Sequence, residues 1–223
     1  MCGVTTVCPT HEDRVNWQFS TKKRYTRWSR REGTGMKSVS EVDLLAARAH
    51  AGQVDKNGVP YIEHVRAVAA GLTPFGDDLV KAGLLHDILE DTDWTAERLR
   101  ETGIPDRVVE IVEAVTNVPG MPYEEKIARI TASPQATLVK ISDNAHNSRP
   151  DRAAQLPPDK RERLDAKYRS ARAQLWSAAR QEDIEAIVRI VNPPLLAELS
   201  EHVAALDGRR GAPRSGGPGP RPS

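Results

Sequence analysis

The sequence contains few of the residues that stabilise small disulfide-rich or zinc-binding domains. Its 223 residues include only two cysteines, Cys2 and Cys8, both close to the N-terminus. Two cysteines do not form a disulfide framework, and together with His11 they supply too few ligands for a structural zinc site. A chain of this length buries enough apolar surface to fold without such links, so we expect one domain flanked by tails.

Long apolar runs and a strong net charge are also missing. No run is long enough to span a bilayer, and no segment has the apolar centre of a secretion signal. The formal net charge is +1, so the protein as a whole has no strong field that would attract nucleic acid. We therefore expect a soluble, cytoplasmic protein whose partners are neither membranes nor nucleic acids.

Two terminal segments differ in composition from the rest of the chain. Residues 1–35 carry seven Lys or Arg against three Asp or Glu and lack apolar periodicity. This pattern predicts a disordered leader, or a start assigned too early with Met36 as the true first residue. The alternative is a basic arm that binds nucleic acid or membrane. Residues 207–223 are rich in Gly, Pro and Arg and are predicted to be disordered, which leaves residues 36–206 as the domain.

Between the tails, helix start and stop signals follow one another, and the alternation typical of β-strands is absent. In "SEVDLLAARAHA", four apolar residues share one face, and Ser40 is a candidate N-cap. The next helix begins near Pro60 and ends at Gly71, and a continuous helix is predicted over residues 77–90. Thr95 is a further candidate N-cap. The start and stop signals predict an all-α bundle of about eight to ten helices.

The stretch "GLLHDILEDT", which begins at Gly83, places four ionisable side chains directly after two leucines. These side chains belong to His86, Asp87, Glu90 and Asp91. On one helix, Glu90 would lie over the face shared by His86 and Asp87. Such a group near a low-dielectric core is costly unless its members are paired or bound to a cation. The stretch therefore predicts a metal site combined with a proton-transfer site.

Further ligands are found in two other apolar stretches. His64 stands in "YIEHVRAV" and Asp143 follows the buried-looking run of "LVKISDNAHN". With His86 and Asp87 they form a set of two histidines and two aspartates, which suits Mn²⁺, Fe²⁺ or Zn²⁺ better than calcium. A lone histidine on an apolar face is usually a core residue, and only the joint presence of the other three makes His64 a ligand candidate.

The segments "AHAGQVDKNGVPYIEH", "HDILEDT" and "KISDNAHN" occur in this order within residues 40–150. This order resembles the HD phosphohydrolase superfamily. Within it, the chain is similar to the (p)ppGpp hydrolase domain of RelA/SpoT proteins and their small single-domain relatives. The resemblance implies a helical HD domain that hydrolyses a nucleotide. The metal ligands that it implies, for Mn²⁺ with Fe²⁺ or Zn²⁺ as alternatives, are His64, His86, Asp87 and Asp143.

The resemblance also implies roles for side chains around the metal. Glu90 and Asp91 would activate the attacking water and transfer protons. His50 and His146 are interpreted as structural groups, which either hydrogen-bond to a metal ligand or pack beside the site. Lys56 is either a substrate contact or an ordinary loop lysine. The substrate-binding residues that the resemblance implies are Lys56, Lys140, Asn147 and Arg149.

Three positions depart from the pattern of alarmone hydrolases. Asp55 stands where these enzymes usually carry an arginine that holds the base, Tyr123 where a lysine is common, and Pro150 where a hydroxyl residue is frequent. The resemblance therefore predicts a complete hydrolytic centre with an altered base-recognition shell.

Three functions stay open at this stage. The first is hydrolysis of (p)ppGpp with release of pyrophosphate from the 3′ side, and the second is hydrolysis of a different nucleotide. The third is a non-catalytic module that senses metal or nucleotide. The presence of both Glu90 and Asp91 favours an enzyme, because a site that had lost its catalytic activity would be expected to have lost one of them.

Overall fold

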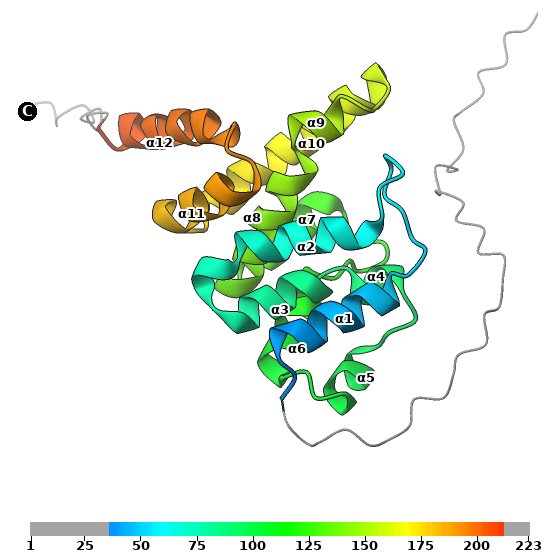
Figure 1. The fold of residues 1–223 in the computed structure, drawn as a ribbon. Helices are drawn as coiled ribbons and strands as arrows, with labels where there is room; N and C mark the ends of the chain where they lie inside the picture. The colour runs from blue at the N-terminus through cyan, green and yellow to red at the C-terminus, as the bar shows by residue number, and fades with distance from the viewer. Residues whose placement is uncertain (1–35, 212–223) are drawn as a thin grey trace, which may run out of the picture. The chain divides into compact units, whose positions relative to one another are not determined.

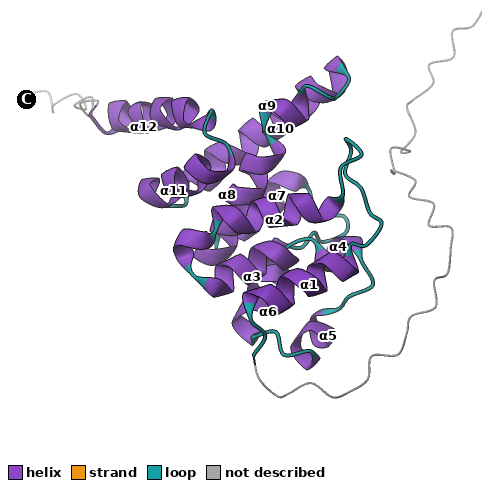
Figure 2. Ribbon diagram, in the orientation of Figure 1, coloured by secondary structure: helices purple, strands orange, loops and turns teal. Residues whose placement is uncertain are grey.

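The computed structural model describes residues 36–211, and it describes side chains as far as residue 206. The described chain is helical and contains no β-strand, only an isolated bridge between Val54 and Pro60 (Figures 1 and 2). The predicted leader, residues 1–35, and residues 212–223 of the predicted tail lie outside it. The α-helices are α1 (Val39–Ala49), α2 (Tyr61–Gly71), α3 (Asp77–Leu85), α4 (Ile88–Asp91), α5 (Ala96–Glu101), α6 (Asp106–Val115), α7 (Tyr123–Thr131), α8 (Pro134–Asn147), α9 (Pro150–Ala153), α10 (Pro158–Ser177), α11 (Gln181–Val191) and α12 (Leu195–Gly211), with a 3-10 helix, η1 (Thr73–Phe75), between α2 and α3.

The all-α class is confirmed, and the helices outnumber the expectation because longer segments are divided. The predicted helix over residues 77–90 ends at Leu85 and resumes at Ile88, so His86 and Asp87 lie in a break and not on one continuous helix. Pro150 begins the separate short helix α9. At the other end of the domain, α12 continues to Gly211 and so overlaps the first residues of the predicted tail. In the described residues, no helix is both long enough and apolar enough to cross a membrane.

Of the two N-cap residues predicted from the sequence, one was wrong and one is confirmed. Helix α1 is capped by Ser38, and the prediction of Ser40 was wrong. The Ser38 side chain accepts a hydrogen bond from the Glu41 N–H, and the Glu41 carboxylate accepts one from the Ser38 N–H. This reciprocal pair satisfies two N–H groups that the first turn would otherwise leave free. Thr95 caps α5 as predicted, by accepting from the Arg98 N–H.

The core depends on close approach between α2 and its neighbours, which lie side by side in Figure 1. Helix α2 packs on α3, α8 and α11. A Cβ atom added to Gly83 of α3 would lie 2.8 Å from the Leu72 Cδ1 and 2.9 Å from the Ala69 Cα. A Cβ on Gly71, the last residue of α2, would collide with the side chains of Val191 and Ser142. These glycines are therefore required for helix packing.

We predict that Gly83→Ala destabilises the fold by about 1–3 kcal/mol, because an overpacked helix contact forces α2 and α3 apart. The free energy of unfolding is measured by urea denaturation. The control is Glu110→Ala, at an exposed position of α6, which should change it by less than about 0.5 kcal/mol. Equal stability of the two variants would contradict the packing argument.

Candidate functional site

The four residues predicted as metal ligands lie together. Side-chain donor atoms of His64, His86 and Asp143 all lie within 4.8 Å of one another. The His64 Nε2 is 3.4 Å from the Asp143 Oδ1 and 3.5 Å from the Asp87 Oδ2. The His86 Nε2 is 2.9 Å from the Asp87 Oδ2 and 3.9 Å from the Asp143 Oδ1. Helices α2 and α8 and the break between α3 and α4 thus bring two imidazoles and two carboxylates to one place, which we call the His/Asp cluster.

The break after α3 orients His86. Its Nδ1–H donates to the Gly83 carbonyl oxygen at 2.8 Å, since that oxygen can only accept. The Nε2 atom therefore faces the carboxylates, is fully buried and has no hydrogen bond of acceptable geometry. Burial alone would lower the pKa of His86, but Asp87 and Asp143 outweigh it and raise this pKa to about 9. The position strongly favours positive charge, as expected of a cation site.

His64 is oriented by His146, one turn beyond Asp143. The two Nδ1 atoms are 2.7 Å apart, and both side chains are buried. One Nδ1 must donate and the other accept, so a lone pair on the His64 Nε2 requires that His64 donate from Nδ1. Burial and the neighbouring His64 lower the pKa of His146 to about 3, so His146 is neutral and can accept.

Each carboxylate of the cluster has its own donors. The Asp143 Oδ2 accepts from the Lys140 Nζ at 2.7 Å, and its Oδ1 accepts from the Asn147 Nδ2 at 2.5 Å. Burial by itself would raise the pKa of Asp143, but Lys140 together with His64 and His86 outweighs burial, and the pKa is lowered. Asp87 accepts from the Tyr61 hydroxyl at 2.6 Å. Sequence reasoning missed Tyr61, although its position one turn before His64 in "PYIEH" places it on the same helix face.

The two residues expected to handle protons lie in different surroundings. The Glu90 Oε1 accepts from the backbone N–H of Asn117 at 2.6 Å and from the Lys126 Nζ at 3.2 Å. Partial burial raises the pKa of the Asp91 carboxyl group to about 6, and the nearby Asp87 carboxylate also raises it. Lys126 was not anticipated from sequence. Glu90 is therefore anchored, whereas Asp91 is electrostatically coupled to the His/Asp cluster.

The four predicted substrate contacts are spread more widely. Lys140 and Asn147 contact Asp143 directly. The Lys56 Nζ lies 3.5 Å from the Tyr168 hydroxyl of α10. Arg149 is paired with Asp151 at the surface, 2.9 Å away.

Asp55, one of the three departures from the alarmone pattern, is bonded to other residues of the protein. Its Oδ1 accepts from the N–H groups of Asn57 and Val59, and its Oδ2 lies 2.8 Å from the Arg152 Nη1. Its side chain is only 4 % exposed. Asp55 therefore fastens the loop before α2 to helix α9, and its charge is matched by Arg152.

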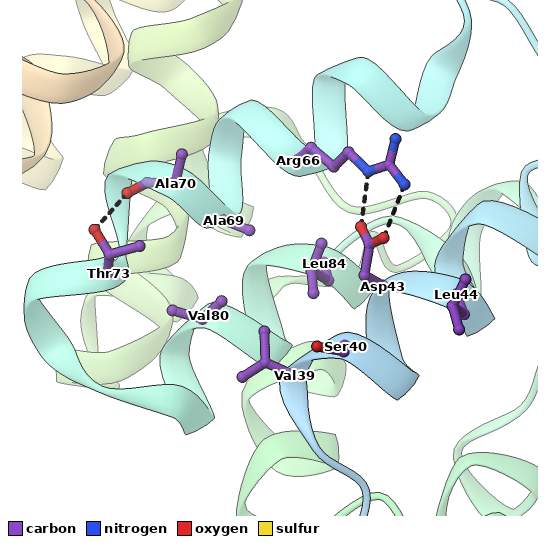
Figure 3. A pocket seen from close by; sticks show the side chains of 10 residues that line it. All are labelled: Val39, Ser40, Asp43, Leu44, Arg66, Ala69, Ala70, Thr73, Val80 and Leu84. Carbon is purple, nitrogen blue, oxygen red and sulfur yellow. Dashed lines mark hydrogen bonds and ion pairs between the residues drawn. The ribbon is translucent and has the colours of Figure 1, made fainter.

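A surface hollow of about 500 Å³ lies elsewhere, between α1, α2 and α3. Figure 3 shows its mostly apolar lining, with the Asp43–Arg66 ion pair at its edge. None of the lining residues belongs to the His/Asp cluster. The lining residues are Val39, Ser40, Asp43, Leu44, Arg66, Ala69, Ala70, Thr73, Val80 and Leu84.

Known proteins resemble this chain over its central part. A Haemophilus influenzae protein named guanosine-3′,5′-bis(diphosphate) 3′-pyrophosphohydrolase is 34% identical over 134 residues, which is 54% of this chain and 19% of the relative. A Mycobacterium leprae protein named probable GTP pyrophosphokinase is 35% identical over 130 residues, 53% of this chain and 16% of the relative. This chain therefore spans less than a fifth of the length of these two relatives.

The fold is also found in a solved structure. A metazoan ortholog of SpoT superposes with a TM-score of 0.56 at 24% identity, over 68% of this chain and 93% of that one. The family model of the HD domain matches residues 44–156, which is half of the chain and includes the whole His/Asp cluster. This chain belongs to the HD domain family.

Proposed function

We propose that this protein is a cytoplasmic, divalent-metal-dependent phosphohydrolase that removes pyrophosphate from the 3′ side of (p)ppGpp. The observation that carries the proposal is the His/Asp cluster with the acid pair Glu90 and Asp91 directly after it. The name of the Haemophilus influenzae relative supports the substrate. In the reaction, water adds to the phosphorus nearest the ribose, and the bond from that phosphorus to the 3′ oxygen breaks. A proton passes to that oxygen, and diphosphate is released.

The donor set fits a divalent transition metal. His64 and His86 would offer Nε2 atoms, and Asp87 and Asp143 would offer carboxylate oxygens. The buried Nε2 of His86 faces carboxylate oxygens, 2.9 Å from the Asp87 Oδ2, without a hydrogen bond of acceptable geometry. Mixed imidazole and carboxylate ligands suit Mn²⁺, with Fe²⁺ or Zn²⁺ as alternatives. When bound, the cation supplies Lewis-acid activation of water and of the phosphoryl group.

The remaining proposed roles belong to side chains of this chain. Asp91 accepts the proton of the attacking water, since a carboxyl group with a pKa of about 6 is ionised at neutral pH and still basic enough to act. Glu90, fixed by Lys126 and Asn117, orients that water. Lys140 and Asn147 hold Asp143 by hydrogen bonds, and their remaining N–H groups are proposed to donate to the phosphates. Lys56 and Arg149 are proposed to contact the rest of the nucleotide.

Hydrolysis of a different nucleotide is the second candidate function, and Asp55 is the observation that favours it. The Asp55 carboxylate is buried against Arg152. It therefore cannot offer the nucleotide base the planar cation and the several N–H donors that an arginine would provide. The reaction would be the same, and only the recognised base would change.

The deciding experiment uses the full chain, loaded with Mn²⁺ and incubated with ppGpp and a panel of other nucleotides. Products are separated by chromatography, and Asp87→Ala serves as the inactive control. We expect pyrophosphate release from ppGpp that is lost in Asp87→Ala. Metal-dependent turnover of another nucleotide alone would reassign the substrate. Bound metal without any turnover would favour a non-catalytic sensor and overturn the proposal.

We predict that Asp91→Asn and Glu90→Gln each lower kcat by about 10²- to 10⁴-fold, the usual contribution of a positioned acid or base. The affinity for Mn²⁺, measured by calorimetry, should fall by less than about tenfold in both variants, because each variant removes a nearby negative charge but no proposed ligand. A variant that keeps wild-type turnover would remove that residue from the proposed mechanism.

We predict that His146→Leu weakens Mn²⁺ binding by about 10- to 100-fold, because the His64 Nδ1–H loses the acceptor that orients its ring. His146→Asn, which keeps an acceptor oxygen, should lose less. Thermal unfolding of both variants controls for general damage to the fold. Equal Mn²⁺ affinity in wild type and His146→Leu would show that His64 needs no such partner.

A further inference from the structure

Three lysines from three helices gather next to the His/Asp cluster. Lys126 belongs to α7, Lys140 to α8 and Lys167 to α10, and we call them the lysine group. Helix α7 packs on both α8 and α10. Lys140 joins the group to the cluster, because its Nζ contacts the Asp143 Oδ2 while the Asp143 Oδ1 faces the two histidines. The lysine group therefore adjoins the cluster across the Asp143 carboxylate.

The lysine group carries more positive charge than its acids neutralise. Lys140 pairs with Asp143, and Lys126 pairs with Glu90 at 3.2 Å. Lys167 has no carboxylate within 4.0 Å among the described residues, and its Nζ lies 4.1 Å from the ring centroid of Tyr123. Asp143 would also be shared with a bound cation. An unmatched ammonium beside such a centre attracts an anion.

Two members of the group lie largely inside the fold, and the third is held by an aromatic ring. The side chains of Lys126 and Lys140 are 7 % and 14 % exposed. The Tyr123 ring fixes the amino group of Lys167 by a cation–π contact, although the Lys167 side chain itself is exposed. Partial desolvation lowers the pKa of Lys167, and the nearby ammonium groups of Lys140 and Lys126 lower it further.

We propose that Lys167, held on Tyr123, binds the outer phosphate of a diphosphate whose inner phosphate lies at the His/Asp cluster. This inference rests on the proposed phosphohydrolase function and adds a specificity-determining residue to it. Lys126 and Lys140 have acid partners, so Lys167 is the member of the group whose charge is not matched by a carboxylate. A monophosphate at the cluster would not use it, so Lys167 makes the site prefer a diphosphate.

The test compares Lys167→Met with Arg169→Met in the full chain. Methionine keeps most of the apolar stem on Tyr123 and removes the charge. Arg169, on the same helix, pairs with Asp165 at the surface, so its variant removes a charge away from the site. The probes are inorganic pyrophosphate and orthophosphate, and their binding is measured by equilibrium dialysis at a fixed free Mn²⁺ concentration.

We expect Lys167→Met to weaken pyrophosphate binding about tenfold, as for the loss of a charge-assisted contact, and orthophosphate binding by less than about twofold. Arg169→Met should change neither, and Mn²⁺ affinity should be the same in all three proteins. Pyrophosphate binding in Lys167→Met equal to that in Arg169→Met would overturn the inference. So would an equal loss for both probes, because Lys167 would then not discriminate between them.

Turnover separates this inference from the proposed function. If wild type hydrolyses ppGpp, Lys167→Met should raise KM about tenfold with little change in kcat, because the contact holds substrate and transition state alike. An unchanged KM would overturn the inference and leave the hydrolase intact. If wild type hydrolyses no nucleotide, the proposed function fails, and the pyrophosphate measurement still decides the role of Lys167.

Discussion

The structure depends on four ionisable side chains that meet at one point between helices, three of them buried. His64, His86 and Asp143 are each less than a tenth exposed, and Asp87 completes the group. Buried charges of this kind are costly unless each is paired. Here every carboxylate faces an imidazole, and the outer atoms of the group are bonded to Tyr61, His146, Lys140 and the Gly83 carbonyl.

The helix packing provides that meeting point. Gly83 allows α3 to approach α2 until a side-chain carbon would no longer fit between them, and its carbonyl then fixes the ring of His86. Ser142, next to Asp143, donates to the Val68 carbonyl oxygen and so ties α8 to α2. The same contacts that close the core therefore set the distances within the His/Asp cluster.

The helical class, the capping role of Thr95 and the four clustered residues could be predicted from sequence, because they depend on local patterns and on one recognisable combination of motifs. The break at His86 could not, since the residues around it carry no helix stop signal and the bond from its side chain to the Gly83 carbonyl oxygen is seen only in the folded protein. Tyr61 and Lys126 were missed because their partners, Asp87 and Glu90, lie 26 and 36 residues away along the chain. Helix periodicity places Tyr61 on the face of His64, but it does not identify a partner that lies so far along the chain.

Two departures from the alarmone pattern have a common feature in the folded protein. Asp55 faces Arg152, and Tyr123 carries the ammonium of Lys167 on its ring. In both cases, a cation from a helix later in the chain lies beside the position where the resemblance implies a basic residue. Both cations come from helices that follow α8: Arg152 belongs to α9 and Lys167 to α10.

The central claim is that the His/Asp cluster binds one metal ion through both imidazoles. Pulsed electron paramagnetic resonance on the Mn²⁺-loaded full chain tests it directly, because coupling to ¹⁴N nuclei reports histidine ligands. The account predicts one tightly bound Mn²⁺ per chain with couplings from two imidazoles, and the loss of one coupling in each of His64→Ala and His86→Ala. Bound Mn²⁺ without ¹⁴N coupling, or couplings that persist unchanged in both variants, would contradict it.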